Sequence, residues 1–341
     1  MLRTLKNILI FTFVFVVCLL LLDRFIFLSE AITPSIYSYD NTIGRILIPN
    51  TPYLFSGEGL GMGSVNAYSY LGKEYSPEKR NGTVRIALLG DSYVESYQTF
   101  DRQYFGRILE DELKNKYNIN AEVLNFGRSG FTMSDMYAYY ENFVKDFKPD
   151  LVLFFVENND FENVNKESGM PYPYTENDSL KIFHYPEFKS NAPWFLSLNQ
   201  LSKYFPIFQI IRNIINLSES GQTPGILFGK LYPQKDVETK TVSNTGTDIV
   251  LIKIIETLSK DSSFVMVFHD KAGINPSLNS QIVSSGIDFI DVNDTLKVLE
   301  ENKIDPYYWK SIGRDGHWNI PTHIVIGEFL ARRLSEKMRR N

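Results

Sequence analysis

The feature that most constrains the fold is the segment LVLFFV at residues 151–156, six apolar residues in a row. A strand that is apolar on both faces is typical of a parallel sheet buried between two layers of helices. Four similar runs flank it, at 84–89, 121–127, 263–269 and 287–292. Amphipathic stretches separate several of these runs, and a last helix is expected over 321–338, with Pro321 in its first turn. The alternation predicts an α/β fold, an α/β/α sandwich with a parallel sheet.

Two segments depart from this alternation. Residues 30–83 are rich in Pro, Gly, Ser, Tyr and Asn, and the stretch SGEGLGMGS at 56–64 is a loop by composition. We expect this part to be an extended lead-in that packs partly on the domain behind it. Residues 161–245 interrupt the pattern after the third strand, so we expect an insertion within a single domain of residues 84–341.

The N-terminus carries an export signal of one of two kinds. Arg3 and Lys6 precede an uncharged apolar run, Ile8 to Leu22, and apolar character continues to Leu28. Residues 1–29 are long enough to span a bilayer, and positive charge before the run places the N-terminus in the cytoplasm. A cleaved signal peptide is the alternative. We expect a retained single-pass membrane anchor, and either reading places the remainder of the chain outside the cytoplasm.

Charge and cysteine content bear on nucleic-acid binding and on disulfide formation. The chain has 341 residues and a net charge of −5, with its Lys and Arg scattered, so nothing indicates nucleic-acid binding. Its single cysteine, Cys18, lies inside the apolar segment, so no disulfide can form in the exported portion.

Four short motifs fall after strands or before the last helix. GDS ends the first strand and contains Ser92, and NFGRSG follows the second with Gly130. NND follows the third strand with Asn159, and GRDGHWN near the C-terminus contains Asp315 and His317. Parallel strands present their carboxyl ends at one edge of the sheet, where α/β proteins bind ligands.

These residue types match the needs of acyl transfer. Ser92 would attack an ester carbonyl, His317 would take and return its proton, and Asp315 would orient the imidazole. The backbone N–H groups of Ser92 and Gly130 and the side-chain amide of Asn159 would form the oxyanion hole. The loop after the first strand lacks G-x-G-x-x-G, which argues against dinucleotide binding.

The four motifs resemble the blocks of the SGNH (GDSL-like) hydrolase family, and the segment from PNTPYLF to LLGDS resembles the lead-in of its membrane-anchored bacterial members. The resemblance implies a flavodoxin-like sheet and cleavage or transfer of acyl groups, often acetyl, on sugars and lipids. It also implies that neither a metal nor an organic cofactor is needed.

Two departures from that family bear on the site. The third block usually has Gly where this chain has Glu157 or Asn158. The acid usually stands three residues before the histidine, a place held here by Arg314, whereas Asp315 stands two before. That shorter spacing resembles SGNH-like polysaccharide acetyltransferases.

Three functions therefore stay open. The first is an esterase that removes acyl groups, notably acetyl, from a cell-envelope carbohydrate or lipid. The second is an O-acyltransferase with the same triad, served by a membrane acyl donor, and the third is a non-catalytic glycan-binding protein. Asp305 is the alternative acid, and His323, within the last helix, is expected to cap or pack.

Overall fold

The computed structural model describes residues 2–28, 36–164, 170–185, 201, 205–208 and 248–340. The chain divides into two compact units. One comprises Met1–Ile36, Thr51–Leu54 and Lys189–Val242, and the other Tyr37–Asn50, Phe55–Phe188 and Ser243–Asn341. The second unit contains the sheet and all the predicted site residues.

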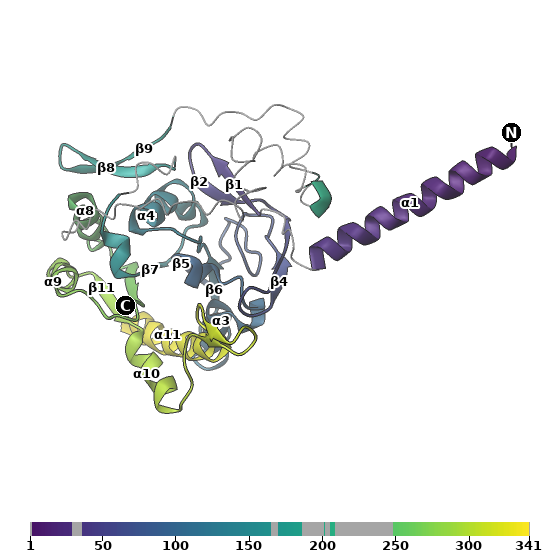
Figure 1. Cartoon of the computed structure of the whole chain (residues 1–341). Coiled ribbons are helices and arrows are strands. Elements are labelled where there is room, and N and C mark those ends of the chain that lie inside the picture. The colour runs from purple at the N-terminus through teal and green to yellow at the C-terminus, as the bar shows by residue number, and fades with distance from the viewer. Residues whose placement is uncertain are drawn as a thin grey trace, which may run out of the picture. The chain divides into compact units, whose positions relative to one another are not determined.

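The first unit begins with the long apolar helix α1, Leu2–Leu28, drawn in purple in Figure 1. Its 27 residues would extend about 40 Å, more than the ~30 Å hydrocarbon core of a bilayer. Most of its apolar side chains are exposed. Asp23 is an exception to the apolar character, and its carboxylate accepts a hydrogen bond from the backbone N–H of Ile207 at 3.0 Å. The predicted N-terminal apolar helix is confirmed, and both a membrane anchor and a signal sequence have these properties.

A five-stranded parallel sheet forms the centre of the second unit (Figure 1). Its strands, in spatial order, are β11 (Asp288–Asp291), β10 (Phe264–Phe268), β7 (Leu151–Val156), β5 (Val84–Leu89) and β6 (Ala121–Asn125). When the five strands are numbered by their place in the sequence and read from β6 to β11, their order is 2-1-3-4-5, as in flavodoxin-like sheets. The predicted α/β fold with a parallel sheet is confirmed.

Helices cover both faces of the sheet because side chains alternate along each strand. On β5, Ile86 and Leu88 join one buried apolar cluster, and Ala87 and Leu89 join the other. The first cluster is completed by α3 (Phe105–Asn115), α10 (Asn293–Glu301) and α11 (Ile320–Arg340). The second is completed by α4 (Met133–Asn142), α8 (Ile249–Leu258) and α9 (Pro276–Ser285).

The described residues also form shorter elements. The strands are β1 (Tyr37–Asp40), β2 (Gly44–Leu47), β3 (Pro52–Phe55), β4 (Gly61–Ser64), β8 (Tyr172–Glu176), β9 (Ser179–Phe183), β12 (Tyr308–Trp309) and β13 (Arg314–Asp315). The short helices are α2 (Ser92–Glu95), η1 (Asp101–Gln103), η2 (Val144–Phe147) and η3 (Asn158–Phe161).

The lead-in is more structured than an extended linker. β1 and β2 form an antiparallel pair, and Tyr70 and Tyr75 are buried in the core cluster that contains Phe126 and Phe147. The hydroxyl of Tyr75 donates to the carboxylate of Glu110 on α3. Aromatic side chains thus hold this segment against the sheet.

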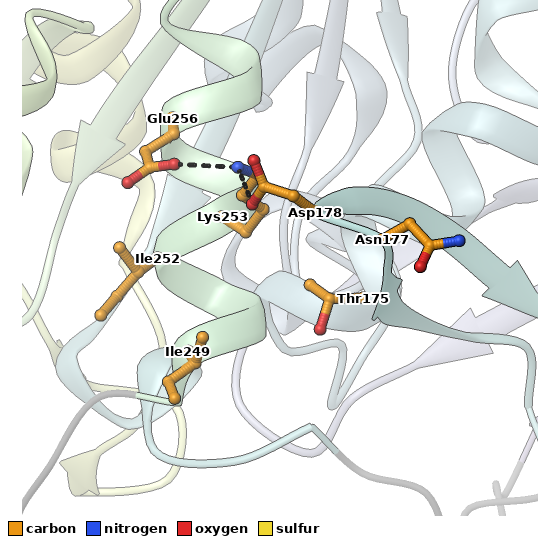
Figure 2. Close-up of a pocket in the computed structure, with 7 residues that line it drawn as sticks. All are labelled: Thr175, Asn177, Asp178, Ile249, Ile252, Lys253 and Glu256. Atoms are coloured by element: carbon orange, nitrogen blue, oxygen red, sulfur yellow. Dashed lines mark hydrogen bonds and ion pairs between the residues drawn. The ribbon is translucent and has the colours of Figure 1, made fainter.

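Most of the predicted insertion at 161–245 lies outside the described residues. The described part includes the hairpin β8–β9, which with α8 borders a cavity of about 360 Å³ (Figure 2). In that cavity the ammonium of Lys253 pairs with Asp178 at 2.6 Å and with Glu256 at 3.5 Å. None of the predicted site residues lines it.

Candidate active site

Ser92 stands where β5 gives way to α2. Gly90 ends the strand, and the carboxylate of Asp91 caps the helix by accepting the N–H of Tyr93 at 2.8 Å. A Cβ at Gly90 would lie 2.3 Å from Cγ2 of Val94, so only glycine permits this tight turn. The turn places the hydroxyl at the carboxyl edge of the sheet.

His317 lies within hydrogen-bond distance of that hydroxyl. Its Nε2 is 2.7 Å from Oγ of Ser92. The residue follows β13 and precedes α11, and the indole of Trp309 donates to its backbone carbonyl at 2.8 Å. The predicted pairing of Ser92 with His317 is therefore present in the structure, although 225 positions separate them.

The carboxylate at the other ring nitrogen belongs to Glu58. Oε1 of Glu58 is 2.8 Å from Nδ1 of His317, and Oε2 accepts the backbone N–H of His317 at 3.0 Å. Both side chains are largely buried. The carboxylate thus fixes the position and the rotation of the imidazole together.

The pKa values of the pair are displaced in opposite directions. Burial by itself would lower the pKa of His317, but the hydrogen bond and charge of Glu58 outweigh it and raise the pKa above its ordinary value. Burial would raise the pKa of Glu58, and the hydrogen bonds and charge of His317 lower it instead. The pair therefore stabilises an imidazolium facing a carboxylate.

Asp315, the predicted acid, does not contact the imidazole. It lies in β13, opposite Tyr308 of β12, and its side chain is exposed. The alternative acid, Asp305, is also exposed and caps a turn by accepting the N–H of Tyr307 at 2.9 Å. The expectation for Asp315 is corrected, because the place beside Nδ1 is filled from the lead-in rather than from the short connection before His317.

Glycines make room for Glu58. A Cβ at Gly316 would lie 2.6 Å from Cδ of Glu58, and one at Gly59 would lie 2.3 Å from the ring of Trp309. The hydroxyl of Ser311 also donates to the backbone carbonyl of Glu58. The one carboxylate in the glycine-rich SGEGLGMGS loop was a signal that the sequence analysis did not use.

Gly130 and Asn159 follow the two strands that flank β5. Gly130 is exposed after β6 with φ of +74°, and a Cβ there would meet no other atom within 4 Å. Asn159 is exposed in η3 after β7, whereas its neighbour Asn158 is tied to Asp270 at 2.7 Å. The described contacts leave Asn159, not Asn158, available to a ligand.

Buried Glu95 holds the loop that carries Gly130. Its Oε2 accepts the N–H of Ser129 at 2.9 Å and also the hydroxyl of Ser129. The hydroxyl of Tyr37 donates to the same oxygen at 2.6 Å, and the guanidinium of Arg45 donates to the carbonyl of Ser129. This network fixes the backbone immediately before Gly130.

His323 has the packing role expected of it. It is fully buried, its Nε2 lies 3.1 Å from Oγ of Ser96, and its ring stacks on Phe105. Burial, with the charge of His317 adding to it, lowers the pKa of His323 to about 3. The side chain is therefore neutral in the folded protein at physiological pH.

A cavity of about 680 Å³ lies beside Glu58. Gly59 and Leu60, the next two residues of the glycine-rich loop, form part of its wall, and Trp309 and Tyr308 contribute aromatic rings. Its remaining lining residues are Lys303, Ile304, Asp305, Lys310, Ser311, Asn319, Ile320 and Pro321. The cavity combines aromatic surface with charged and polar groups.

Comparison with known proteins gives one family match. The model of the family GDSL-like Lipase/Acylhydrolase matches residues 86–187, which contain Ser92, Gly130 and Asn159. The match spans less than half of the chain. No curated protein matches.

Solved structures give distant likenesses. A G-D-S-L family protein from Desulfitobacterium hafniense DCB-2, proposed to be lipolytic, is 16% identical with a TM-score of 0.34, covering 73% of this chain and 98% of its own. A catalytic mutant of Axe2, an acetylxylan esterase from Geobacillus stearothermophilus, is 14% identical with a TM-score of 0.39, covering 74% and 94%. An acetyl xylan esterase, AlAXEase, is 14% identical with a TM-score of 0.34, covering 74% and 99%. Because these identities and TM-scores are low, the fold assignment is based on the strand order, and the reaction class is inferred from the geometry of the site.

Proposed function

We propose that the chain is a serine-dependent esterase that removes acyl groups, acetyl foremost, from a carbohydrate or lipid of the cell envelope. The observation that carries this proposal is the relay of hydrogen bonds from Ser92 through His317 to Glu58, at 2.7 and 2.8 Å. A serine hydroxyl is a weak nucleophile unless a base lies within hydrogen-bond reach, and the base needs a third group to orient it. The match of residues 86–187 to a lipase and acylhydrolase family supports the same reaction class.

The reaction would proceed in two steps. Oγ of Ser92 attacks the ester carbonyl carbon while Nε2 of His317 takes its proton, and the same proton then passes to the departing alcohol. Water, deprotonated by His317, attacks the resulting acyl-enzyme and releases the acid. Glu58 keeps the Nδ1 proton in place and stabilises the imidazolium in both steps.

Charge that develops on the carbonyl oxygen needs donors already in position. We assign that role to the N–H groups of Ser92 and Gly130 and to the amide of Asn159, which follow three adjacent strands. Removing one such donor typically costs about 10²–10³ in rate. The network around Glu95 would hold the Gly130 backbone for this purpose.

The cavity beside Glu58 suits a sugar-bearing substrate. Tyr308 offers an exposed aromatic ring, and Asp305, Lys303 and Lys310 offer hydrogen-bond partners. Ligand sites of this kind combine apolar lining with a few polar groups. We therefore propose that the alcohol part of the ester extends along this wall.

A covalent probe tests the proposal. The full chain, purified in detergent, is treated with a serine-reactive fluorophosphonate and digested for mass spectrometry. We expect a label on Ser92 that is absent in Ser92→Ala and strongly reduced in His317→Ala. Normal ester hydrolysis by a folded Ser92→Ala protein would refute the mechanism, and a folded wild type with neither label nor turnover would favour a binding protein.

The acceptor of the acyl group is tested separately. Wild-type protein is incubated with p-nitrophenyl acetate in the presence and absence of a bare oligosaccharide, and the oligosaccharide is weighed by mass spectrometry. A hydrolase releases acetate and leaves the oligosaccharide unchanged. A gain of acetyl that requires Ser92 would instead identify an O-acyltransferase.

A further inference from the structure

A second group of chemically active side chains lies beside Ser92 and is not used by the proposed reaction. Asp91 follows β5, Glu157 follows β7, and His269 follows β10, three adjacent strands of the sheet. One ligand atom of each, two carboxylate oxygens and an imidazole nitrogen, lies within 4.8 Å of the others. Nδ1 of His269 is 3.3 Å from Oε1 of Glu157.

His269 is the unusual member of this group. Only 1% of it is exposed, and among the described residues neither ring nitrogen has a hydrogen-bond partner. Its ring is held by Tyr93, Trp318 and Phe155, with centroids 5.0, 5.3 and 6.4 Å away. A buried polar group without a partner costs about 1–3 kcal/mol, so a ligand bound to this ring would stabilise the folded protein.

The carboxylates of Asp91 and Glu157 each have an oxygen close to the His269 ring. Asp91 uses Oδ1 for the N–H of Tyr93, which leaves Oδ2 for another partner. Among the described contacts the Glu157 carboxylate has no lysine or arginine partner, and the nitrogen base beside it is Nδ1 of His269, at 3.3 Å. Both are only partly exposed, which distinguishes them from a solvated acidic surface.

We propose that Asp91, Glu157 and His269 bind one divalent transition-metal ion beside the nucleophile. One imidazole nitrogen and two carboxylate oxygens suit Zn²⁺, and three protein ligands leave a position for water. Mg²⁺ prefers an octahedral set of oxygens and would bind more weakly. The three side chains need to move together only slightly, because their ligand atoms already lie within 4.8 Å.

The inference is independent of the esterase proposal and is tested by binding alone. The full chain in detergent is stripped with EDTA, dialysed against ZnCl₂ or MgCl₂, and analysed for bound metal by mass spectrometry. We expect one Zn²⁺ per chain and a melting temperature that rises with zinc concentration. Absence of bound zinc in the folded wild type would overturn the proposal.

Variants separate this site from adventitious binding. Glu157→Gln keeps the shape of the half-buried side chain and should weaken zinc affinity at least about tenfold. His269→Phe, which keeps an aromatic ring in the packed position, should abolish stoichiometric binding. His184→Ala, a change at an exposed histidine, is the matched control and should bind zinc as the wild type does. Unchanged affinity in Glu157→Gln, or loss of zinc only in His184→Ala, would refute the assignment.

Discussion

Replacing Glu58 by glutamine is the sharpest test of the site. The substitution preserves size and an oxygen that can accept the backbone N–H of His317, now 3.0 Å from Oε2. It removes the negative charge beside Nδ1, and the new amide can donate to that nitrogen and favour the wrong tautomer. We expect the folded protein to survive and its turnover to fall.

The size of the loss follows from the geometry. Glu58 and His317 are 16% and 31% exposed at the side chain, so an effective dielectric constant near 20 applies to them. Two unit charges about 4 Å apart then attract by about 4 kcal/mol. That attraction exists only when the imidazole is charged, as in the transition state, so its loss should lower kcat about 10³-fold.

The pH profile supplies a second readout. The base acts when neutral, so kcat/KM rises with pH through the pKa of His317, which Glu58 raises against the opposing effect of burial. In Glu58→Gln this acidic limb should move to lower pH. A merely structural role for Glu58 would reduce activity without moving the limb.

The assay is hydrolysis of p-nitrophenyl acetate by the full chain from pH 4 to 9, with circular dichroism to check folding. Asp315→Asn is the matched control, because its side chain is exposed in β13, and it should retain near-normal kcat. A folded Glu58→Gln enzyme with normal kcat, or a large loss in Asp315→Asn alone, would refute the assignment of the acid.

Three further outcomes are expected. Asn159→Ala should lower kcat about 10²–10³-fold with little change in KM. Asn158→Ala loses bonds to Asp270 and Gly273, so it should lower the melting temperature instead. The reverse pattern would exclude Asn159 from the oxyanion hole. The pKa of His323 is about 3 in the folded protein and about 6.5 in the unfolded chain, so its contribution to stability is complete above pH 6.5 and is lost as pH falls toward 3. The free energy of unfolding in urea should therefore be less sensitive to acid in His323→Phe. Equal sensitivity in the two proteins would contradict the buried neutral ring. Protease added to spheroplasts should digest the domain and leave a short N-terminal fragment, full protection would contradict the topology, and a mature N-terminus at Ile32 would indicate a cleaved signal.

The sheet was predictable because its strands carry their own evidence. LVLFFV is apolar at every position, and β7 runs over the residues expected of it, Leu151–Val156. Burial on both faces leaves no polar position in such a strand, so the bounds of the apolar run in the sequence are also the bounds of the strand. The lead-in was harder, because Tyr70 and Tyr75 are buried by contacts with Phe126, Phe147 and Glu110, which no periodicity within the lead-in reveals.

The site was predictable where the chemistry sits at strand ends and not where it depends on a distant loop. Ser92 could be predicted because it follows the end of a strand of the parallel sheet, and His317 because its motif before the last helix resembles the last block of the SGNH family. The acid was assigned to Asp315 by nearness in sequence, but β12 and β13 hold Asp315 in an exposed two-residue ladder. Nearness along the chain gives no information about which carboxylate faces Nδ1.

Glu58 also changes what counts as the catalytic domain. A chain beginning at residue 84 would retain every strand of the sheet, the serine and the histidine, yet it would lack the carboxylate that orients the imidazole. It would also lose Tyr70 and Tyr75 from the core and leave the carboxylate of Glu110 without its tyrosine donor. The lead-in segment is therefore part of the fold and of the proposed active site, which combines Glu58 of the lead-in with Ser92 and with His317 near the C-terminus.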